Sequence, residues 1–472
     1  MSETWDAIVV GSGPNGLAAA ATIANAGFSV LILEASSELG GGAATAELTL
    51  PGFLHDLCSA IHPLAVSSPA FLGMPLRQHG LEWVHPDAPL AHPLDGGRAV
   101  VLDRSLAATA GALAADSNSY YRLLDPAVGN WEMIAGARFH FPRNIAGLVR
   151  FGFSCVRSSR AVLDSQFRGV AARALVAGLA AHSNLRPDEA FSAGFGLILA
   201  AAAHAVGWPF PRGGAGRIAN ALASYLRSMG ATFQTAMRVD SLDGLPRCRI
   251  VLCDVSPREL ARIGGRRFPA SYRRQLESFR YGPAAFKLDW AMDSAIPWAA
   301  PECRRAGTVH VGGAAGEIAA CENAVQAGQC PEQPFVIVAQ HTLFDPSRAP
   351  ARKHTAWAYC HLPNGAAENM TDRIERQIER FAPGFRNRIL ARSVLGPVDL
   401  ERHNSNLVGG DFCGGSNNWR QLFARPTIRA CRTPDRRVLI CSAATPPGAG
   451  VHGMCGYFAA RVALRRLRGR SL

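Results

Sequence analysis

Three glycines near the start of the sequence have a spacing that suits a dinucleotide. Gly11, Gly13 and Gly16 form the pattern G-x-G-x-x-G in "GSGPNG", directly after an apolar stretch and before an alanine-rich one. In such a loop the first glycine permits a tight turn, the second lets the backbone approach a pyrophosphate, and the third lets helix and strand pack closely. Amide groups at the helix start favour the phosphate charges. Glu34, 23 positions after Gly11, suits a carboxylate that accepts hydrogen bonds from an adenosine ribose.

Two further glycine-rich stretches indicate more contact with the nucleotide. Gly40, Gly41 and Gly42 follow Glu34 closely and could bring more backbone to the same pyrophosphate. Near the other end of the sequence, "TPPGAGVHGMCGY" is a poor place to build a core. The first motif fits NAD and FAD equally well. A terminal loop that faces the ribityl chain and ring of a larger cofactor favours FAD, and a simple NAD dehydrogenase, which would leave this loop without a role, stays an alternative.

The elements that must position these loops form a β–turn–α–β unit at the start of the chain. Residues 7–10 and 29–35 are predicted to be buried strands, and Glu34 lies at the end of the second. The small residues between the two strands are predicted to form a helix that ends at Gly27. The same pattern returns later, as a helix within 211–230 and as strands within 231–242, 247–256 and 437–444.

We therefore predict an α/β fold in which a Rossmann-like domain is discontinuous. Its segments are residues 1–75, 211–268 and 426–472, and an inserted α+β substrate domain takes residues 76–210 and 269–425. In the substrate domain we expect strands such as "AAFKLDWAM" and "FVIVAQHTLF" and a polar helix over residues 372–380.

Composition narrows the classes of function. The chain has 472 residues and a formal charge of +13, but lysine occurs only at Lys287 and Lys353 and the many arginines are dispersed. We interpret them as a solvated surface, so no nucleic-acid partner is expected, although the basic end of the sequence, "RRLRGR", hints at contact with a membrane or a partner. No clustering of ligand-type side chains suggests a metal.

The cysteines and one apolar segment bear on the compartment. Twelve cysteines and the lack of a signal peptide at the printed start favour a reducing, cytoplasmic location. Cys248 and Cys253 make a C-x4-C pair, but an odd separation on a strand sends their side chains to opposite faces, which argues against a redox dithiol. The uncharged segment Ala190–Phe210 is predicted to be a buried helix and not a membrane span, and peripheral contact with a membrane stays open.

These motifs resemble the phytoene desaturase-like flavoproteins of the FAD-dependent amine oxidase superfamily. The resemblance covers essentially the whole chain, and the branch that looks nearest is that of the pyridine nucleotide-disulfide oxidoreductase domain-containing proteins. It rests on motifs that include "GSGPNGLAAA", "LGGGAATAELTLPGFLHDLCSAIHP", "GWPFPRGGAGRIANAL", "VLCDVSPREL", "FRYGPAAFKLDWAM", "DPSRAP", "KHTAWAYCHLP" and "TPPGAGVHGMCGY".

The resemblance implies a role in FAD binding for particular residues. Gly11, Gly13 and Gly16 would hold the pyrophosphate, and Glu34 the adenosine ribose. The remaining residues implied at the cofactor lie along the phosphates (Gly41, Gly42 and Ala43), at the adenine (Val239, in the strand after the segment 211–230) and at the ribityl chain or flavin ring (Thr445, Gly450, Val451 and His452). Many relatives carry an arginine in the second glycine motif, where "GGGAA" has none, and Gly-Asp where this chain has Ser442 and Ala443.

The expected function is that of an FAD-dependent oxidoreductase. Hydride would pass to the flavin from a hydrophobic substrate, isoprenoid-like or lipid-like. His62 and His452 are candidates to lie beside the ring, although a lone histidine is more often structural. Lys287 could be a buried cation beside the flavin or a strand residue with its head in water, and the second interpretation is preferred. Two other functions stay open: a redox-neutral isomerase that needs reduced flavin, and a flavin-free binding protein resembling the GDP-dissociation inhibitors.

Overall fold

The structure is a computed structural model that describes residues 4–137 and 142–469. Its first sheet is parallel and has five strands, in the order β16-β10-β1-β2-β9. The strands come from three separate stretches of the chain: β1 (Trp5–Val10), β2 (Val30–Leu33), β9 (Thr232–Gln234), β10 (Cys248–Cys253) and β16 (Val438–Ile440). A parallel sheet of this kind needs helical crossovers, and it confirms the predicted Rossmann-like α/β fold.

Helices cover both faces of this sheet. Alternate strand residues such as Val9 and Ile32 point to one face, where they pack in one core with α1 (Pro14–Ala24), α11 (Gly216–Ser228) and α18 (Met454–Leu467). Ile8 and Leu31 point to the other face, against α12 (Pro257–Gly264) and α13 (Ala270–Glu277). Burial on both faces explains why these strands are almost wholly apolar.

The second sheet has seven strands, in the order β15-β11-β14-β13-β12-β6-β7, and only the pair β12–β6 is parallel. The strands are β6 (Ala88–Leu94), β7 (Arg98–Leu102), β11 (Ala284–Met292), β12 (Ala306–Val311), β13 (Val336–Ala339), β14 (His354–Leu362) and β15 (Ile389–Leu395). The amphipathic helix α15 (Thr371–Phe381), predicted for residues 372–380, covers one face through Ile374 and Ile378. The opposite face of this sheet packs against the helices described next.

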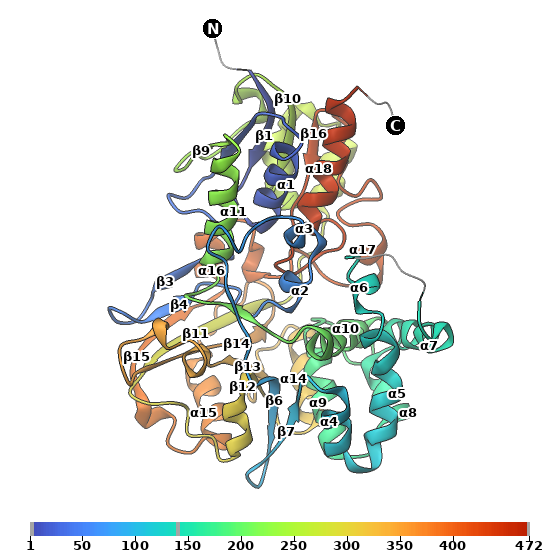
Figure 1. Cartoon of the computed structure of the whole chain (residues 1–472), viewed down its shortest axis with the longest axis vertical. Coiled ribbons are helices and arrows are strands. Elements are labelled where there is room, and N and C mark those ends of the chain that lie inside the picture. Colours follow the sequence, from blue (N-terminus) through green and yellow to red (C-terminus); the bar gives the residue numbers. More distant parts are fainter. Residues whose placement is uncertain (1–3, 138–141, 470–472) are drawn as a thin grey trace.

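Those helices form a lobe beside the second sheet, at the lower right of Figure 1. They share one apolar core, and they are α4 (Leu106–Ala112), α5 (Ser117–Val128), α7 (Ile145–Val156), α8 (Ser159–Gln166), α9 (Val170–Ala181), α10 (Ser192–Ala205) and α14 (Ala315–Gln326). The predicted buried helix within Ala190–Phe210 is α10, and among the described residues no helix has the length and apolarity needed to cross a membrane.

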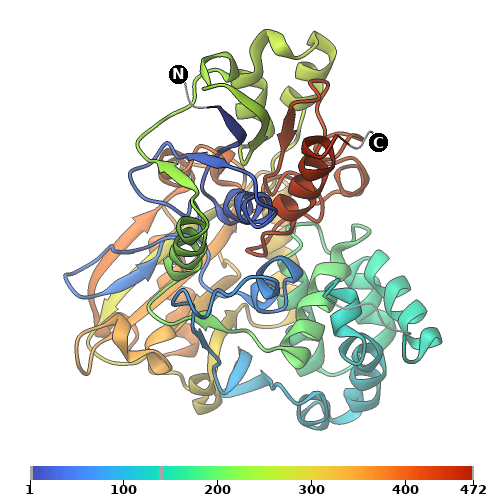
Figure 2. The ribbon, with the colours of Figure 1, turned by 45° about the horizontal axis from the view of Figure 1, so that its top comes forward.

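The remaining short elements lie outside the two sheets, and in Figure 2 the blue segment of residues 63–72 lies between the Rossmann-like part and the rest. They are β3 (Thr45–Glu47) and β4 (Leu54–Asp56), which pair as a hairpin, β5 (Trp83–Val84) and β8 (Phe210–Pro211), which also pair, and α2 (Pro63–Val66), α3 (Pro69–Leu72), α6 (Trp131–Ile134), α16 (Pro397–His403) and α17 (Trp419–Phe423). The limits predicted for the two domains stay a prediction.

Two local predictions were wrong. Val239 does not lie in a strand, because β9 ends at Gln234 and Ala236 takes a left-handed backbone conformation (φ 54°) that an extended strand cannot contain. The predicted strand within "FVIVAQHTLF" ends at Ala339, and His341–Leu343 form a short 3-10 helix.

Candidate functional site

The first two glycine-rich stretches meet at the carboxyl ends of β1 and β2. The amide of Gly40 donates to the backbone oxygen of Ser12 (3.2 Å), and a Cβ added to Gly41 would lie 3.5 Å from the Cα of Gly13. Gly11, Gly40 and Gly41 have φ values of 98°, 115° and 54°, which L side chains rarely adopt. The two loops therefore form one backbone-lined surface, at the edge of a parallel sheet where ligands bind.

Glu34 borders this surface. It follows β2 directly, and its Oε2 accepts hydrogen bonds from the amide of Ser12 (2.8 Å) and from Ser12 Oγ (2.6 Å). Its Oε1 accepts from the amide of Ser36 (2.8 Å). The carboxylate is thus held in a fixed orientation beside the first glycine loop, as an adenosine ribose would require.

The glycine loops contain amide groups that have no hydrogen-bond partner in the described chain. Such free donors are what a bound diphosphate requires. Within residues 4–137 and 142–469, the amides of Gly13, Gly41 and Gly42 donate to no other atom. Amides at the start of a helix that have no protein partner are the groups that bind phosphate oxygens, so the residues present fit such a group.

Asp254 is a residue of this site that the sequence analysis quoted without assigning. Its Oδ2 accepts a hydrogen bond from the amide of Gly16 (2.8 Å), and a Cβ added to Gly13 would lie 2.6 Å from the same oxygen. Burial raises the pKa of this carboxyl to about 7. A sequence signal existed, because Asp254 directly follows the apolar strand "RIVLC", and the carboxyl ends of parallel strands share one edge.

The terminal loop leads into α18, which packs against the start of α1 although the two helices come from opposite ends of the chain. A Cβ added to Gly456 in α18 would lie 1.8 Å from the backbone oxygen of Asn15, so α18 rests directly on the start of α1. Thr445 is tied to this helix through its backbone oxygen, which accepts from Cys455 Sγ (3.2 Å). The loop that carries Thr445, Gly450, Val451 and His452 is therefore placed beside the glycine surface, while contact of these residues with a ring stays a prediction.

The two histidines proposed as catalytic are buried and neutral at pH 7. His452 Nδ1 accepts from the amide of Met454 (3.0 Å), so the ring caps the start of α18, and burial lowers its pKa to about 4. His62 Nε2 lies 3.2 Å from Ser59 Oγ, its Nδ1 has no hydrogen-bond partner in the described chain, and burial lowers its pKa to about 4. His452 thus has a clear structural role, and a catalytic role for either histidine stays a prediction.

Lys287 is not a surface residue, and the prediction that its head lies in water was wrong. Its side chain is 2% exposed and its Nζ pairs with Asp289 on the same face of β11. His55 Nδ1 lies 3.5 Å from Asp289 Oδ1. The charge of Lys287 also acts on the Cys58 thiol, which lies close to Gly42. A buried ion pair therefore lies near the second glycine loop.

The face of the second sheet that carries this ion pair is mainly aromatic and apolar, with one further buried polar pair. Lys287 is opposite Tyr359 of β14, and Asp289 is opposite Trp357. His361, the next residue of β14 on this face, has its Nδ1 2.9 Å from Glu322 Oε1 of α14. Such a wall, with few polar groups, suits a largely apolar ligand.

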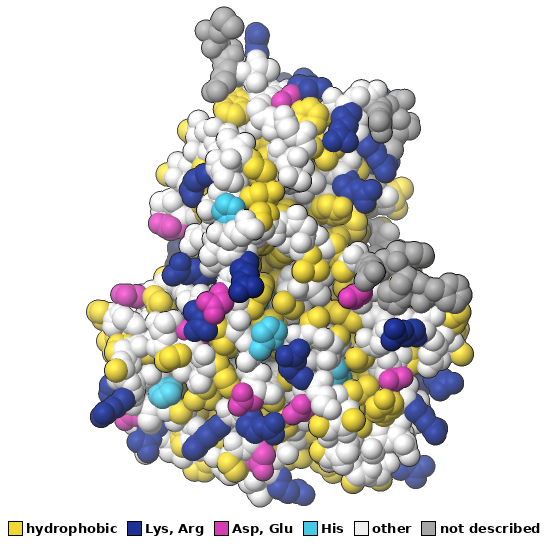
Figure 3. Space-filling view, in the orientation of Figure 1, with side chains coloured by type: hydrophobic (Ala, Val, Ile, Leu, Met, Phe, Trp, Pro, Cys, Tyr) yellow, Lys and Arg dark blue, Asp and Glu magenta, His cyan; other side chains and the backbone are white. Residues whose placement is uncertain are grey.

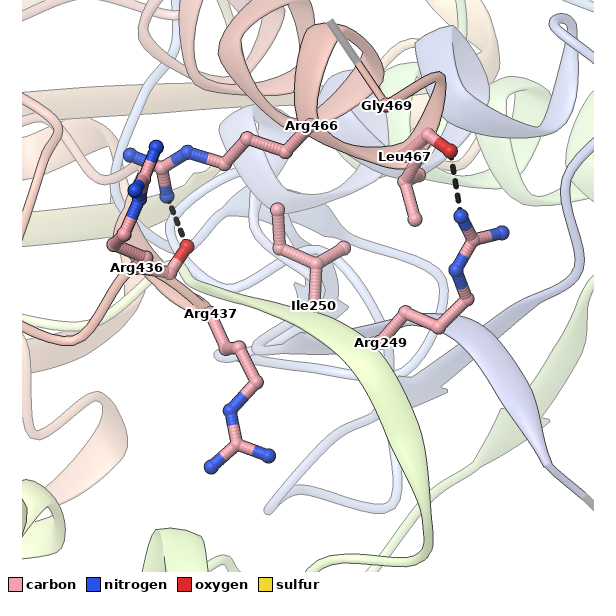
Figure 4. A pocket seen from close by; sticks show the side chains of 7 residues that line it. All are labelled: Arg249, Ile250, Arg436, Arg437, Arg466, Leu467 and Gly469. Atoms are coloured by element: carbon pink, nitrogen blue, oxygen red, sulfur yellow. Dashed lines mark hydrogen bonds between the residues drawn. The ribbon is translucent and has the colours of Figure 1, made fainter. Parts of the chain in front are cut away.

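Other candidate chemical features contribute no reactive group to this site. Cys248 is partly buried, and burial raises the pKa of the Cys253 thiol to about 12, so neither behaves as a reactive thiolate. Among the described residues no cluster of histidine, cysteine or acidic side chains could hold a metal. The pocket in Figure 4, of about 390 Å³, is lined mainly by arginines: Arg249, Arg436, Arg437 and Arg466 with Ile250, Leu467 and Gly469. It lies at the amino ends of β10 and β16, opposite the glycine loops.

Comparison with known proteins agrees with this geometry. Residues 9–72 match the family described as NAD(P)-binding Rossmann-like domain. Pyridine nucleotide-disulfide oxidoreductase domain-containing protein 2 of Mus musculus is 25% identical over 99% of this chain and 94% of its own length. An oxidoreductase from Methanosarcina mazei has a TM-score of 0.66 at 15% identity (98% of this chain, 100% of its own). A triple variant of putrescine oxidase has a TM-score of 0.64 at 15% identity (99% of each chain). The chain therefore has the same fold as this oxidoreductase and putrescine oxidase.

This shared fold does not by itself decide the activity. The Rab GDI of Plasmodium falciparum shares it with a TM-score of 0.56 at 11% identity over the whole of both chains. The same fold thus occurs in proteins with different roles, and function has to be argued from the residues at the glycine loops and at the sheet face.

Proposed function

We propose that the protein is an FAD-dependent oxidoreductase whose substrate lies against the buried face of the seven-stranded sheet. The observation that supports this most directly is the meeting of two glycine loops with unused amides, beside the Glu34 carboxylate and the start of α18. Gly13, Gly41 and Gly42 would hold the pyrophosphate, and Glu34 the adenosine ribose. A bound FAD supplies a ring that accepts a hydride.

The chain's own residues would orient the substrate and keep water away. Trp357 and Tyr359 present aromatic surface, and both are less than a tenth exposed. Lys287 Nζ donates to Asp289 Oδ2, so this ion pair, like the pair of His361 with Glu322, places a polar point on a wall that is mainly aromatic and apolar. The proposed substrate is accordingly a hydrophobic molecule, isoprenoid-like or lipid-like, in a phytoene desaturase-like dehydrogenation.

The proposal also includes the cellular location and the expected partners of the protein. All twelve cysteines are free thiols, which supports a cytoplasmic protein. On the face shown in Figure 3, arginines lie singly or in small groups among acidic side chains, which speaks for a solvated surface and against a nucleic-acid partner. Peripheral contact with a membrane remains a means of reaching an apolar substrate.

Cofactor titration tests the first half of the proposal. FAD, FMN and NAD are each titrated into cofactor-free protein while the heat of binding is measured by calorimetry. FAD should bind most tightly, and Glu34→Gln should weaken FAD by about tenfold, because one or two hydrogen bonds to the ribose are lost. Glu38→Gln, an exposed neighbour, is the control and should bind like wild type. Equal affinities for FAD and FMN would contradict the role of Glu34.

Anaerobic reduction separates the rival functions. A dehydrogenase bleaches its flavin when an apolar donor is added. An isomerase instead converts substrate only after the flavin has been reduced, with no net loss of reducing equivalents. A binding protein of the GDP-dissociation-inhibitor type takes up no flavin at all.

A further inference from the structure

The carboxyl of Asp254 stands inside the first glycine loop. Its Oδ2 is bound to the amide of Gly16, while its Oδ1 makes no hydrogen bond to any atom in the described chain. The residue keeps 8% of its surface exposed. One oxygen of a nearly buried acid therefore remains free at the point where the two glycine loops meet.

The charges around Asp254 are unusual for a phosphate site. Glu34 at the end of β2 is the charged side chain that acts on it, and it opposes ionisation of Asp254. The other titratable groups facing it are thiols with raised pKa values, namely Cys253 on its own strand, Cys441 after β16 and Cys455 on α18. The neighbouring segment offers the uncharged Asn406, which donates to the backbone oxygen of Asp254 (3.1 Å). The second glycine motif supplies no arginine.

We propose that Asp254 is a further cofactor-binding residue, which acts as a neutral carboxylic acid and donates a hydrogen bond from its free oxygen to the pyrophosphate. This inference rests on the proposed binding of FAD. An ionised carboxylate would repel the diphosphate at close range. A protonated carboxyl instead supplies a hydrogen-bond donor, as an arginine of the second glycine motif does in many relatives. Burial already brings its pKa to about 7 in the free protein, so the neutral form is accessible near neutral pH.

The sign of the pH dependence follows from this. FAD binds the protonated form, so the pKa of Asp254 is higher in the complex than in the free protein. Affinity should be constant below about pH 7 and should fall by about tenfold for each pH unit above it, until the pKa of the complex is reached.

The test is the dissociation constant of FAD between about pH 5.5 and pH 8.5 for wild type, Asp254→Asn and the control Asp240→Asn. An asparagine can still accept from Gly16 and donate outward, so Asp254→Asn should bind FAD with wild-type affinity at low pH and show no pH dependence. Asp240, whose side chain is mostly exposed, should leave the wild-type profile unchanged. The proposal would be overturned if the dissociation constant of wild type did not change with pH, or if Asp254→Asn showed the same pH dependence as wild type.

A second measurement does not depend on any variant. Calorimetric titration of wild type with FAD at pH 8, in two buffers of different ionisation enthalpy, should show uptake of nearly one proton per FAD bound. Binding without proton uptake would refute the role of Asp254 and leave FAD binding intact. Folded wild-type protein that binds no FAD at any pH would instead overturn the proposed function, and this inference with it.

Discussion

At the scale of single residues, the glycines of the first loop serve the protein's own packing as well as a ligand. A Cβ added to Gly16 would lie 2.2 Å from the backbone oxygen of Gly11, and one added to Gly11 would lie 2.8 Å from the backbone oxygen of Asp254. These glycines are therefore required even without a bound nucleotide, because strand, helix and loop approach too closely for any side chain.

Gly16→Ala should accordingly destabilise the protein before any cofactor is considered. We expect a loss of about 2 kcal/mol or more in the free energy of unfolding, because backbone atoms have to move apart. Gly111→Ala is the matched control: a Cβ there meets nothing within 4 Å in α4, and alanine should stabilise that helix by up to about 1 kcal/mol. Urea unfolding without FAD measures both, and equal stabilities for wild type and Gly16→Ala would contradict the packing described here.

Some residues of the site could be predicted from the sequence and others could not. Gly11, Gly13, Gly16 and Glu34 have a spacing set by one local β–turn–α–β unit, so their positions follow from adjacent sequence. Lys287 was misjudged because its burial depends on the pairing of β11 with β14 and on the packing of His55, which no local pattern reveals.

At the scale of elements, the contact between α18 and α1 determines where the terminal loop lies. Gly456 and Gly453 bring the start of α18 against Asn15 and Ala18 of α1. The strands and helices of the Rossmann-like segments were largely predictable, since apolar strands and amphipathic helices have clear periodicity, whereas most elements within residues 76–210 were not predicted individually. Their pairing was not, because α1 and α18 come from opposite ends of the chain.

Gly456→Ala should push α18 away from α1 and carry the terminal loop with it. We expect lower stability and a weaker affinity for FAD, by about tenfold or more, although the first glycine loop is unchanged. Gly316→Ala in α14, where a Cβ meets nothing within 4 Å, should leave FAD affinity unaltered. Thermal unfolding and FAD titration give the two readouts. Unchanged affinity in a destabilised Gly456→Ala protein would separate the terminal loop from the cofactor site.

At the scale of the whole molecule, one buried arginine ties together the segments that connect the two sheets. Arg348 is fully buried; its Nη1 donates to Asp56 Oδ2 (2.7 Å), its Nε to Asp345 Oδ2 (3.2 Å) and its Nη2 to the backbone oxygen of Pro211 (2.8 Å). Asp56 lies at the end of β4, Pro211 at the end of β8 before α11, and Asp345 beside β14. The guanidinium holds the pKa of Asp56 well below its usual range.

Arg348→Met should lower the free energy of unfolding at pH 7 by about 3–5 kcal/mol, because two buried carboxylates lose their partner. Arg402→Met, at an exposed pair with Asp399, should cost less than about 1 kcal/mol. The folded-state pKa of Asp56 is depressed, so its pairing contributes stability above the unfolded pKa near about 4, and this contribution is lost as pH falls below it. The difference between wild type and Arg348→Met should therefore shrink in acid, and a constant difference from pH 7 down into acid would contradict this ion-pair account.

The central claim is that the two glycine loops and the terminal loop together hold FAD, and the protein as purified tests it most directly. The account predicts a yellow protein with the visible spectrum of a bound flavin, which on denaturation releases FAD and neither FMN nor NAD. A folded, colourless protein that also fails to take up added FAD would contradict it.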